Sequence, residues 1–151
     1  MRVLLARHGE AVDAASDRLR PLGGKGREDV ERVARTLAAQ GVRVERVIHS
    51  GRVRAEQTAA IWLRWLAPEV TLEVDGRLDP DEDPAPLAAW LAHAEGDTLL
   101  VGHLPNLPRL AGLLLRGDGE GTSYASFRPG TALVLERDGG GRWRRIAHLD
   151  P

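Results

Sequence analysis

The chain has 151 residues, of which 42% are hydrophobic and 28% charged, the composition of a globular domain large enough to bury a core. It contains no cysteine, which excludes a disulfide scaffold, a thiolate metal site and a cysteine nucleophile. Its formal net charge of −1 gives no field that would draw it to nucleic acid or to anionic lipid, so we expect neither as a partner.

Short apolar runs and amphipathic helical patterns alternate along the chain. The expected elements, in order, are strand 2–6, helix 25–40, strand 46–49, helix 52–66, strand 71–74, helix 84–94, strand 98–102, a helix from near 105 through 115, and strands 131–137 and 143–149. An Asp-Gly-Gly-Gly turn joins the last two strands into a hairpin. This order predicts a single α/β domain over residues 1–151, a three-layer α/β/α sandwich with a mostly parallel sheet and a C-terminal β-hairpin.

The sequence also indicates the location of the protein and the character of one loop. The chain enters its first strand without a charged leader and an apolar signal segment, so we expect a cytoplasmic protein. No apolar run approaches the ~20 residues that cross a bilayer, so we expect no membrane association. Residues 116–126 are rich in glycine and polar side chains, which favours a surface connection over a loop at the site.

Two histidines each follow the C-terminal end of an expected strand. One is His8, within Arg7-His8-Gly9, and the other is His103. Ser50 lies at a third such end, and Arg54 follows one turn later at the start of a helix. In parallel α/β sheets, ligands bind beyond the carboxyl ends of the strands. Because the guanidinium fork of arginine suits a phosphoryl group, the pattern predicts a phosphate site at this edge.

Four sequence segments occur in an order that is more specific than any one of them. They are Arg7-His8-Gly9-Glu10, Ser16-Asp17-Arg18-Leu19-Arg20-Pro21-Leu22, Ser50-Gly51-Arg52-Val53-Arg54-Ala55-Glu56-Gln57-Thr58 and Gly102-His103-Leu104-Pro105. Together they resemble the histidine phosphatase superfamily, whose fold is phosphoglycerate mutase-like, and within it the branch of small SixA-type phosphohistidine phosphatases. The resemblance extends from residue 2 to about residue 115.

The resemblance implies a role for each of four residues. His8 is the implied nucleophile, which attacks phosphorus and carries the phosphoryl group as a covalent phosphohistidine. Arg7, Arg54 and His103 are implied to bind the non-bridging oxygens, where the charge of the transition state is held. These groups neutralise the phosphoryl charge, so the resemblance implies neither a metal ion nor another cofactor.

Three further residues are candidates for substrate binding. Arg20 would reach the phosphoryl group from the segment before the first helix, and Gly9 would let a substrate approach the backbone closely. Ser50 would hydrogen-bond the phosphate, with a cap of the following helix as the alternative interpretation.

The general acid is the point at which this sequence departs from the family. Ester-cleaving members carry a glutamate in a Leu-x-Glu setting near the third strand, and Leu78-Asp79-Pro80 places a proline there. Asp79 and Asp81, with Glu82 beside them, could replace it, although the spacing assigns none of them, and the alternative is that this acidic loop is only solvated.

The missing glutamate favours one substrate class. An alkoxide leaving group needs a well-placed acid, whereas an imidazole is protonated near neutral pH and leaves readily. We therefore expect a phosphatase that acts on protein phosphohistidine. Phosphotransfer domains and phosphotransferase-system proteins are partners that the resemblance implies. The alternatives are a small-molecule phosphomonoesterase, a non-catalytic phosphate-binding module and, most distantly, a nucleic-acid-binding domain.

Overall fold

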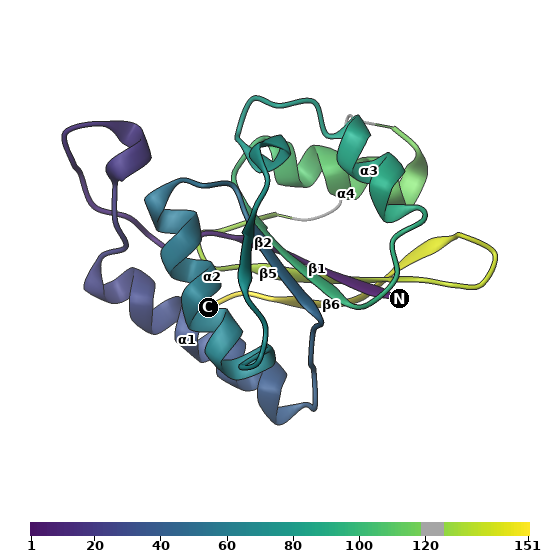
Figure 1. The fold of residues 1–151 in the computed structure, drawn as a ribbon, viewed down its shortest axis with the longest axis horizontal. Coiled ribbons are helices and arrows are strands. Elements are labelled where there is room, and N and C mark those ends of the chain that lie inside the picture. The colour runs from purple at the N-terminus through teal and green to yellow at the C-terminus, as the bar shows by residue number, and fades with distance from the viewer. Residues whose placement is uncertain (119–125) are drawn as a thin grey trace.

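A six-stranded sheet runs through the molecule in the computed structural model, which describes residues 1–118 and 126–151 (Figure 1). The strand order is β3-β2-β4-β1-β5-β6. The strands are β1 (Arg2–Arg7), β2 (Arg46–His49), β3 (Leu72–Val74), β4 (Thr98–Gly102), β5 (Ala132–Arg137) and β6 (Trp143–Leu149). In these two described stretches, no helix combines the length and the apolar character needed to cross a membrane.

Strand β1 lies between β4 and β5 and carries the first motif at its end. It pairs in parallel with β4, with Arg7 opposite Gly102. Residues His8 and His103, which follow that pair, therefore leave the sheet at the same edge. On its other side β1 pairs with β5 in antiparallel register, and β5 pairs with β6 in the expected hairpin.

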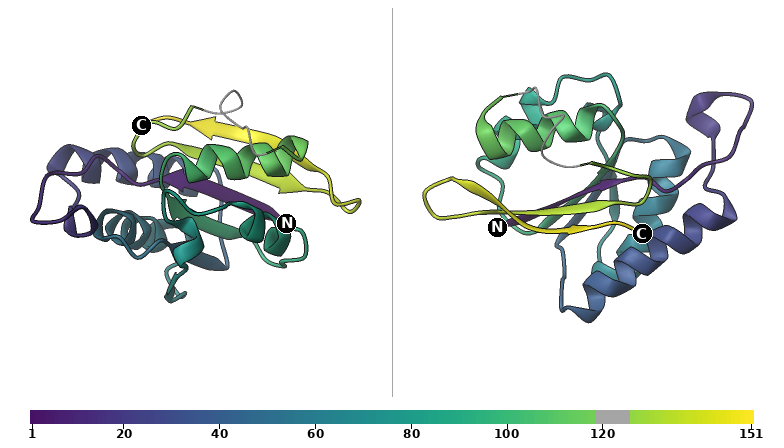
Figure 2. Two further views of the ribbon diagram at one scale, coloured as in Figure 1. Left: turned by 90° about the horizontal axis from the view of Figure 1, so that it is seen from above. Right: turned by 180° about the vertical axis from the view of Figure 1, so that it is seen from behind.

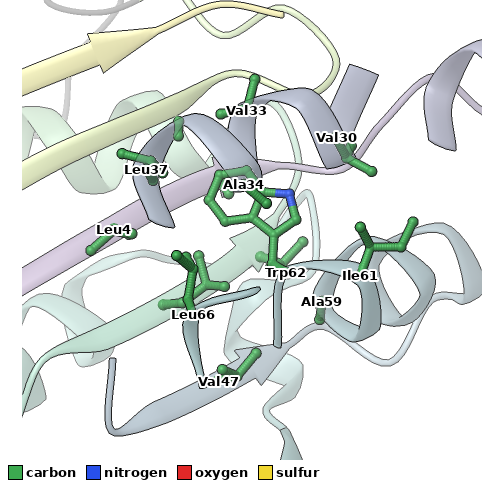
Figure 3. Close-up of a cluster of buried hydrophobic side chains, with 14 of the residues drawn as sticks. Leu4, Val30, Val33, Ala34, Leu37, Val47, Ala59, Ile61, Trp62 and Leu66 are labelled. Carbon is green, nitrogen blue, oxygen red and sulfur yellow. The ribbon is translucent and has the colours of Figure 1, made fainter. Parts of the chain in front are cut away.

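Helices cover both faces of the sheet (Figures 1 and 2). One face is covered by α1 (Gly24–Ala39) and α2 (Val53–Leu66), and the other by α3 (Ala85–Leu91) and α4 (Asn106–Arg116). Successive strand side chains point to opposite faces. Leu4 accordingly packs in the cluster around Trp62 that Figure 3 shows, while Leu5 packs with Leu107 on the other face. The predicted fold class is confirmed.

The third helix is shorter than the sequence predicts. Expected over 84–94, it ends at Leu91. The guanidinium of Arg137 on β5 donates to the carbonyl oxygens of Leu91 and Ala94, the latter at 2.9 Å. These contacts provide donors for carbonyls at and just beyond the end of the helix, which have no intrahelical partner, and Gly96 then turns the chain at a φ of 83°. The other main elements begin and end within two residues of expectation.

Residues 11–22, here called the arm, project from the body of the molecule between β1 and α1 (Figure 1). A β-bridge between Ala11 and Leu22 closes the base of the arm. The arm contains a short 3-10 turn, η1 (Asp17–Leu19), that the sequence analysis did not predict. A second unpredicted turn, η2 (Gly76–Leu78), follows β3.

At Gly26, helix α1 crosses closely over the chain that follows β1, so a larger residue at this position should destabilise the protein. A Cβ at position 26 would lie 2.1 Å from the carbonyl oxygen of Glu10. We expect Gly26→Ala to lower the free energy of unfolding by ~1–3 kcal/mol in urea denaturation, the usual cost of overpacking. Gly24→Ala is the matched control, because nothing lies within 4 Å of its Cβ position. It should be neutral or stabilise by up to ~1 kcal/mol, and equal stability of both variants would contradict the close crossing.

Candidate active site

The His8 ring is held by the backbone that follows β1. The backbone N–H of His8 donates to the carbonyl of Gly102 at 3.1 Å, which extends the β1–β4 pairing to this residue. The ring atom Nδ1 lies 2.7 Å from the carbonyl oxygen of Gly9. Since a carbonyl only accepts, Nδ1 carries the proton and the lone pair is on Nε2. The backbone N–H of Gly9 in turn donates to Thr58 Oγ1 on α2 at 3.0 Å.

Arg54 contacts the free nitrogen of that ring. It lies in the first turn of α2 and is 5% exposed. Its Nε donates to His8 Nε2 at 3.3 Å, which agrees with a lone pair on that atom. Its two terminal nitrogens donate to Asp17, at 2.8 Å to the carbonyl oxygen and 3.2 Å to the carboxylate. Arg54 is therefore fixed between the nucleophile candidate and the arm.

His103 follows β4 and packs beside His8. The two ring centroids lie 4.9 Å apart with a 48° tilt. His103 is 2% exposed, and its Nε2 lies 2.6 Å from the hydroxyl oxygen of Ser50. The sequence expectation of a helix starting near Pro105 agrees with α4, which begins at Asn106. The backbone N–H of Leu107 donates to the His103 carbonyl at 3.0 Å, so the positive N-terminal end of α4 lies beside this strand end.

Arg7 approaches from the last position of β1. Its Nη1 donates to the carbonyl of Phe127 at 2.8 Å. Its Nε is buried and has no hydrogen-bond partner among the described residues. A buried donor without an acceptor costs free energy, so an oxygen-rich anion would stabilise this arrangement.

These groups surround a cavity of about 270 Å³. Five of the residues in its wall were singled out from the sequence, and Glu10 was not. The wall is formed by Arg7, His8, Glu10, Ala11, Arg20, Arg54, Pro80, His103, Leu104 and Pro129. Its composition, basic and imidazole groups at strand ends, suits a phosphoryl group.

Both histidines of the cavity are held neutral. Burial is the main cause that lowers the pKa of His8 to about 4; the Gly9 carbonyl raises this pKa, and Arg54, Arg7 and Arg20 lower it. Burial also lowers the pKa of His103 to about 2, assisted by repulsion from the neighbouring His8 ring whenever that ring is protonated and by the positive charge of Arg54. A neutral His8 with its lone pair on Nε2 is the form of imidazole that can attack phosphorus.

Asp17 in the arm is the counterion of this cationic group, and the sequence analysis gave it no role. Its carboxylate accepts from Arg20 at 3.4 Å, from Arg54 at 3.2 Å and from Arg52. Partial burial raises its pKa, but the three guanidiniums outweigh this and lower it overall. The contacts with Arg52 and Arg54 join segments 35 and 37 residues apart in sequence, so no local pattern indicates the role of Asp17 at the site.

Arg20 lines the cavity from the arm, as expected. Its Nε donates to the carbonyl of Val12 at 3.3 Å and one terminal nitrogen to Asp17. These contacts hold the Arg20 side chain against the arm, in a position where it forms part of the cavity wall.

Two of the candidates for substrate binding do not line the cavity. A Cβ at Gly9 would meet Val30 Cγ1 at 2.7 Å, so the missing side chain admits helix α1 and not a substrate. Ser50 is buried behind His103, where its hydroxyl also accepts from the backbone N–H of Arg52 at 3.3 Å. Arg52 is the N-cap residue of α2, so this contact places the Ser50 hydroxyl just before the helix, and a cap of the first turn by Ser50 stays a prediction.

None of the candidate acids, Asp79, Asp81 or Glu82, lines the cavity either. The two carboxylate oxygens of Asp79 accept from Arg18 at 3.0 Å and from Arg52 at 2.9 Å. Asp81 lies in the wall of a different cavity, with Arg109. Pro80, between them, is the residue of this loop that faces the site. Of the glycine-rich loop 116–126, residues 119–125 lie outside the described residues.

Comparisons with known proteins agree with this geometry. The family model of the histidine phosphatase superfamily (branch 1) matches residues 3–79. Phosphohistidine phosphatase SixA of Escherichia coli (strain K12) is 35% identical over 123 residues, covering 78% of this chain and 76% of that protein. The structure of the protein histidine phosphatase SixA complexed with tungstate has a TM-score of 0.89 at 30% identity, covering 99% of this chain and 97% of that chain. The alpha-ribazole phosphatase from Shigella flexneri shares the fold, with a TM-score of 0.78 at 17% identity, covering 100% of this chain and 96% of that one.

The fold, the cationic cavity and these relatives define a phosphatase. The chain belongs to the histidine phosphatase superfamily, as the family match and the identity to SixA show.

The low pKa of His8 can be measured directly. A pKa of about 4 means that the ring stays neutral from pH 7 down to about pH 5, whereas an unperturbed ring would protonate near 6.5. We expect NMR titration of His8 to show this, and Arg54→Gln to raise the pKa because one repelling charge is removed. Arg64→Gln, an exposed position later on α2, is the control and should leave it unchanged. A wild-type midpoint near 6.5 would contradict a buried, neutral ring.

Proposed function

We propose that this phosphatase removes the phosphoryl group from phosphohistidine on proteins, through a covalent phosphohistidine formed on His8. The observation that carries the proposal is the state of the His8 ring, which is neutral, with its proton held on Nδ1 by the Gly9 carbonyl and its lone pair on Nε2 inside a cationic cavity. This is the arrangement that a nitrogen nucleophile needs.

In the first step, Nε2 of His8 attacks phosphorus and the bond from phosphorus to the substrate imidazole breaks. Arg7 and Arg54 hold the non-bridging oxygens, so the charge that develops on them is stabilised in place. For this contact Arg54 exchanges its hydrogen bond with Nε2 for one with an oxygen. The substrate imidazole leaves with a proton taken from solvent.

In the second step, water attacks phosphorus and His8 is the leaving group. Because Nδ1 keeps its proton, the phosphorylated ring is a cation, and cleavage of the P–N bond returns it to the neutral form. Inorganic phosphate is released, and the water protons remain on phosphate or pass to solvent. The donors of the cavity neutralise the phosphoryl charge, so we propose that neither step needs a metal ion or another cofactor.

The choice of phosphohistidine rests on the leaving group. Asp79 and Asp81 stand outside the cavity, and an imidazole leaves without a strong general acid. The cavity, at about 270 Å³, is also smaller than the roughly 300–1,000 Å³ of typical small-molecule pockets. It suits a phosphoryl group presented on a protein side chain. The relatives named phosphohistidine phosphatase support the same class.

The physiological partner is proposed by class alone. A phosphotransfer domain or a phosphotransferase-system protein carries phosphohistidine on its surface, where a cationic cavity on another protein can bind it. The net charge of −1 gives no reason to propose nucleic acid or a membrane surface as a partner.

A small-molecule phosphomonoesterase is the second candidate, and one observation favours it. Glu10 is a carboxyl in the cavity wall and would be the acid of an ester-cleaving reaction. Its side chain is 57% exposed and lies 3.4 Å from Lys25, which directs it toward the surface. A non-catalytic phosphate-binding module would use the same cavity without turnover.

The covalent intermediate gives the first test of the proposal. Incubation with a 32P-labelled phosphohistidine protein, followed by rapid denaturation, should label the wild-type chain with the acid-labile and base-stable signature of phosphohistidine. His8→Ala should show no label and no turnover, because the nucleophile is gone. His93→Ala, outside the cavity, is the control and should be labelled like the wild type. Unlabelled wild type with tight phosphate binding would favour the non-catalytic module.

The substrate class gives the second test. We expect kcat/KM on a phosphohistidine protein to exceed that on sugar and nucleotide monophosphates by at least about a hundredfold, because alkoxides leave poorly without a placed acid. Asp81→Asn, which leaves the Asp79–Arg52 ion pair intact, should change the phosphohistidine rate less than about threefold. A preference for esters that Glu10→Gln abolishes would establish the phosphomonoesterase instead.

A further inference from the structure

We infer that Ser50 is a positioning residue: its hydroxyl holds the proton of His103 on Nδ1, so that the neutral ring can donate a hydrogen bond to a phosphoryl oxygen. The inference rests on the proposed phosphoryl site. It replaces the direct contact between Ser50 and substrate that the sequence suggested.

The hydrogen bonds of Ser50 determine the direction of its contact with His103. Its Oγ accepts from the backbone N–H of Arg52 at 3.3 Å and lies 2.6 Å from His103 Nε2. In the part of the chain that the structure describes, Nε2 is the acceptor available to the hydroxyl proton. Both residues are buried, so solvent does not compete for this proton. The hydroxyl therefore donates and Nε2 accepts.

The position of the His103 proton follows from that direction. A neutral imidazole has one N–H, and the hydrogen bond made by one nitrogen decides which nitrogen carries the proton. With Nε2 accepting from Ser50, the proton is on Nδ1. Within residues 1–118 and 126–151, this buried Nδ1 has no hydrogen-bond partner. A phosphoryl oxygen held beside His8, whose ring centroid is 4.9 Å away, would supply the acceptor.

The tautomer of His103 determines whether it can donate to the phosphoryl group, because the ring is neutral near pH 7 and has only one N–H. Burial, the neighbouring His8 and the positive charges of Arg54 and Arg52 lower the pKa of the ring, and the Asp17 carboxylate offsets this only in part. His103 therefore acts on an anion as a neutral donor. In the opposite tautomer its one N–H would be used by Ser50, and the phosphoryl group would receive none.

NMR of the histidine side chains tests the tautomer without any need for turnover. Long-range 1H–15N spectra at pH 7 should show a protonated Nδ1 and an unprotonated Nε2 for His103. Ser50→Ala should move protonation toward Nε2, and Ser50→Thr, which keeps the hydroxyl, should retain the wild-type pattern. A wild-type ring protonated on Nε2 would overturn the inference, and this spectrum remains decisive should Ser50→Ala fail to fold.

Binding of inorganic phosphate and the rate with imidazole N-phosphate test the consequence. Ser50→Ala should weaken phosphate binding and slow the reaction by about tenfold each, in the direction expected when a preorganised donor is lost. Ser50→Thr should stay within about twofold of wild type, as should Ser16→Ala, an exposed serine in the arm. A changed tautomer with unchanged phosphate affinity would remove His103 as a donor. Phosphate binding and tautomer are independent of catalysis, so an inactive wild type would contradict the proposed function and leave this inference standing.

Discussion

The hydrogen bond from His8 Nδ1 to the Gly9 carbonyl is the constraint on which the site depends. It determines which nitrogen carries the lone pair, and it does so only because Gly9 is itself held by Thr58 and packed against α1. A side chain at Gly9 would push this backbone away from the helix and rotate the carbonyl. The position of the proton on the His8 ring thus depends on Gly9, whose backbone packs against α1 in the protein interior.

The same site concentrates guanidinium groups that would repel one another without counterions. Asp17 and Asp79 provide them, and both contact Arg52. Their contacts also join the arm, the start of α2 and the loop after η2. These two carboxylates therefore have an assembling role, which leaves the phosphoryl charge to be neutralised by the cationic and imidazole groups of the cavity wall.

Element order and the strand-end residues were predictable from the sequence because both depend on local patterns. Alternating apolar runs indicate strands, and parallel strand ends meet at one edge, so Arg7, His8 and His103 could be placed together. The roles of Asp17 and Ser50 could not be predicted, since each depends on partners more than thirty residues away. The early end of α3 has the same origin, a guanidinium supplied by β5.

The C-terminal hairpin carries no recognisable motif, yet it covers the strand that leads into His8, the proposed nucleophile. Residues of β5 pair along β1, and the backbone N–H of Gly130 donates to the carbonyls of both Arg7 and His8. A chain that ended before this hairpin would leave β1 as an open sheet edge, able to pair with another molecule and to aggregate. A boundary for a minimal catalytic fragment therefore cannot be drawn where the family resemblance ends.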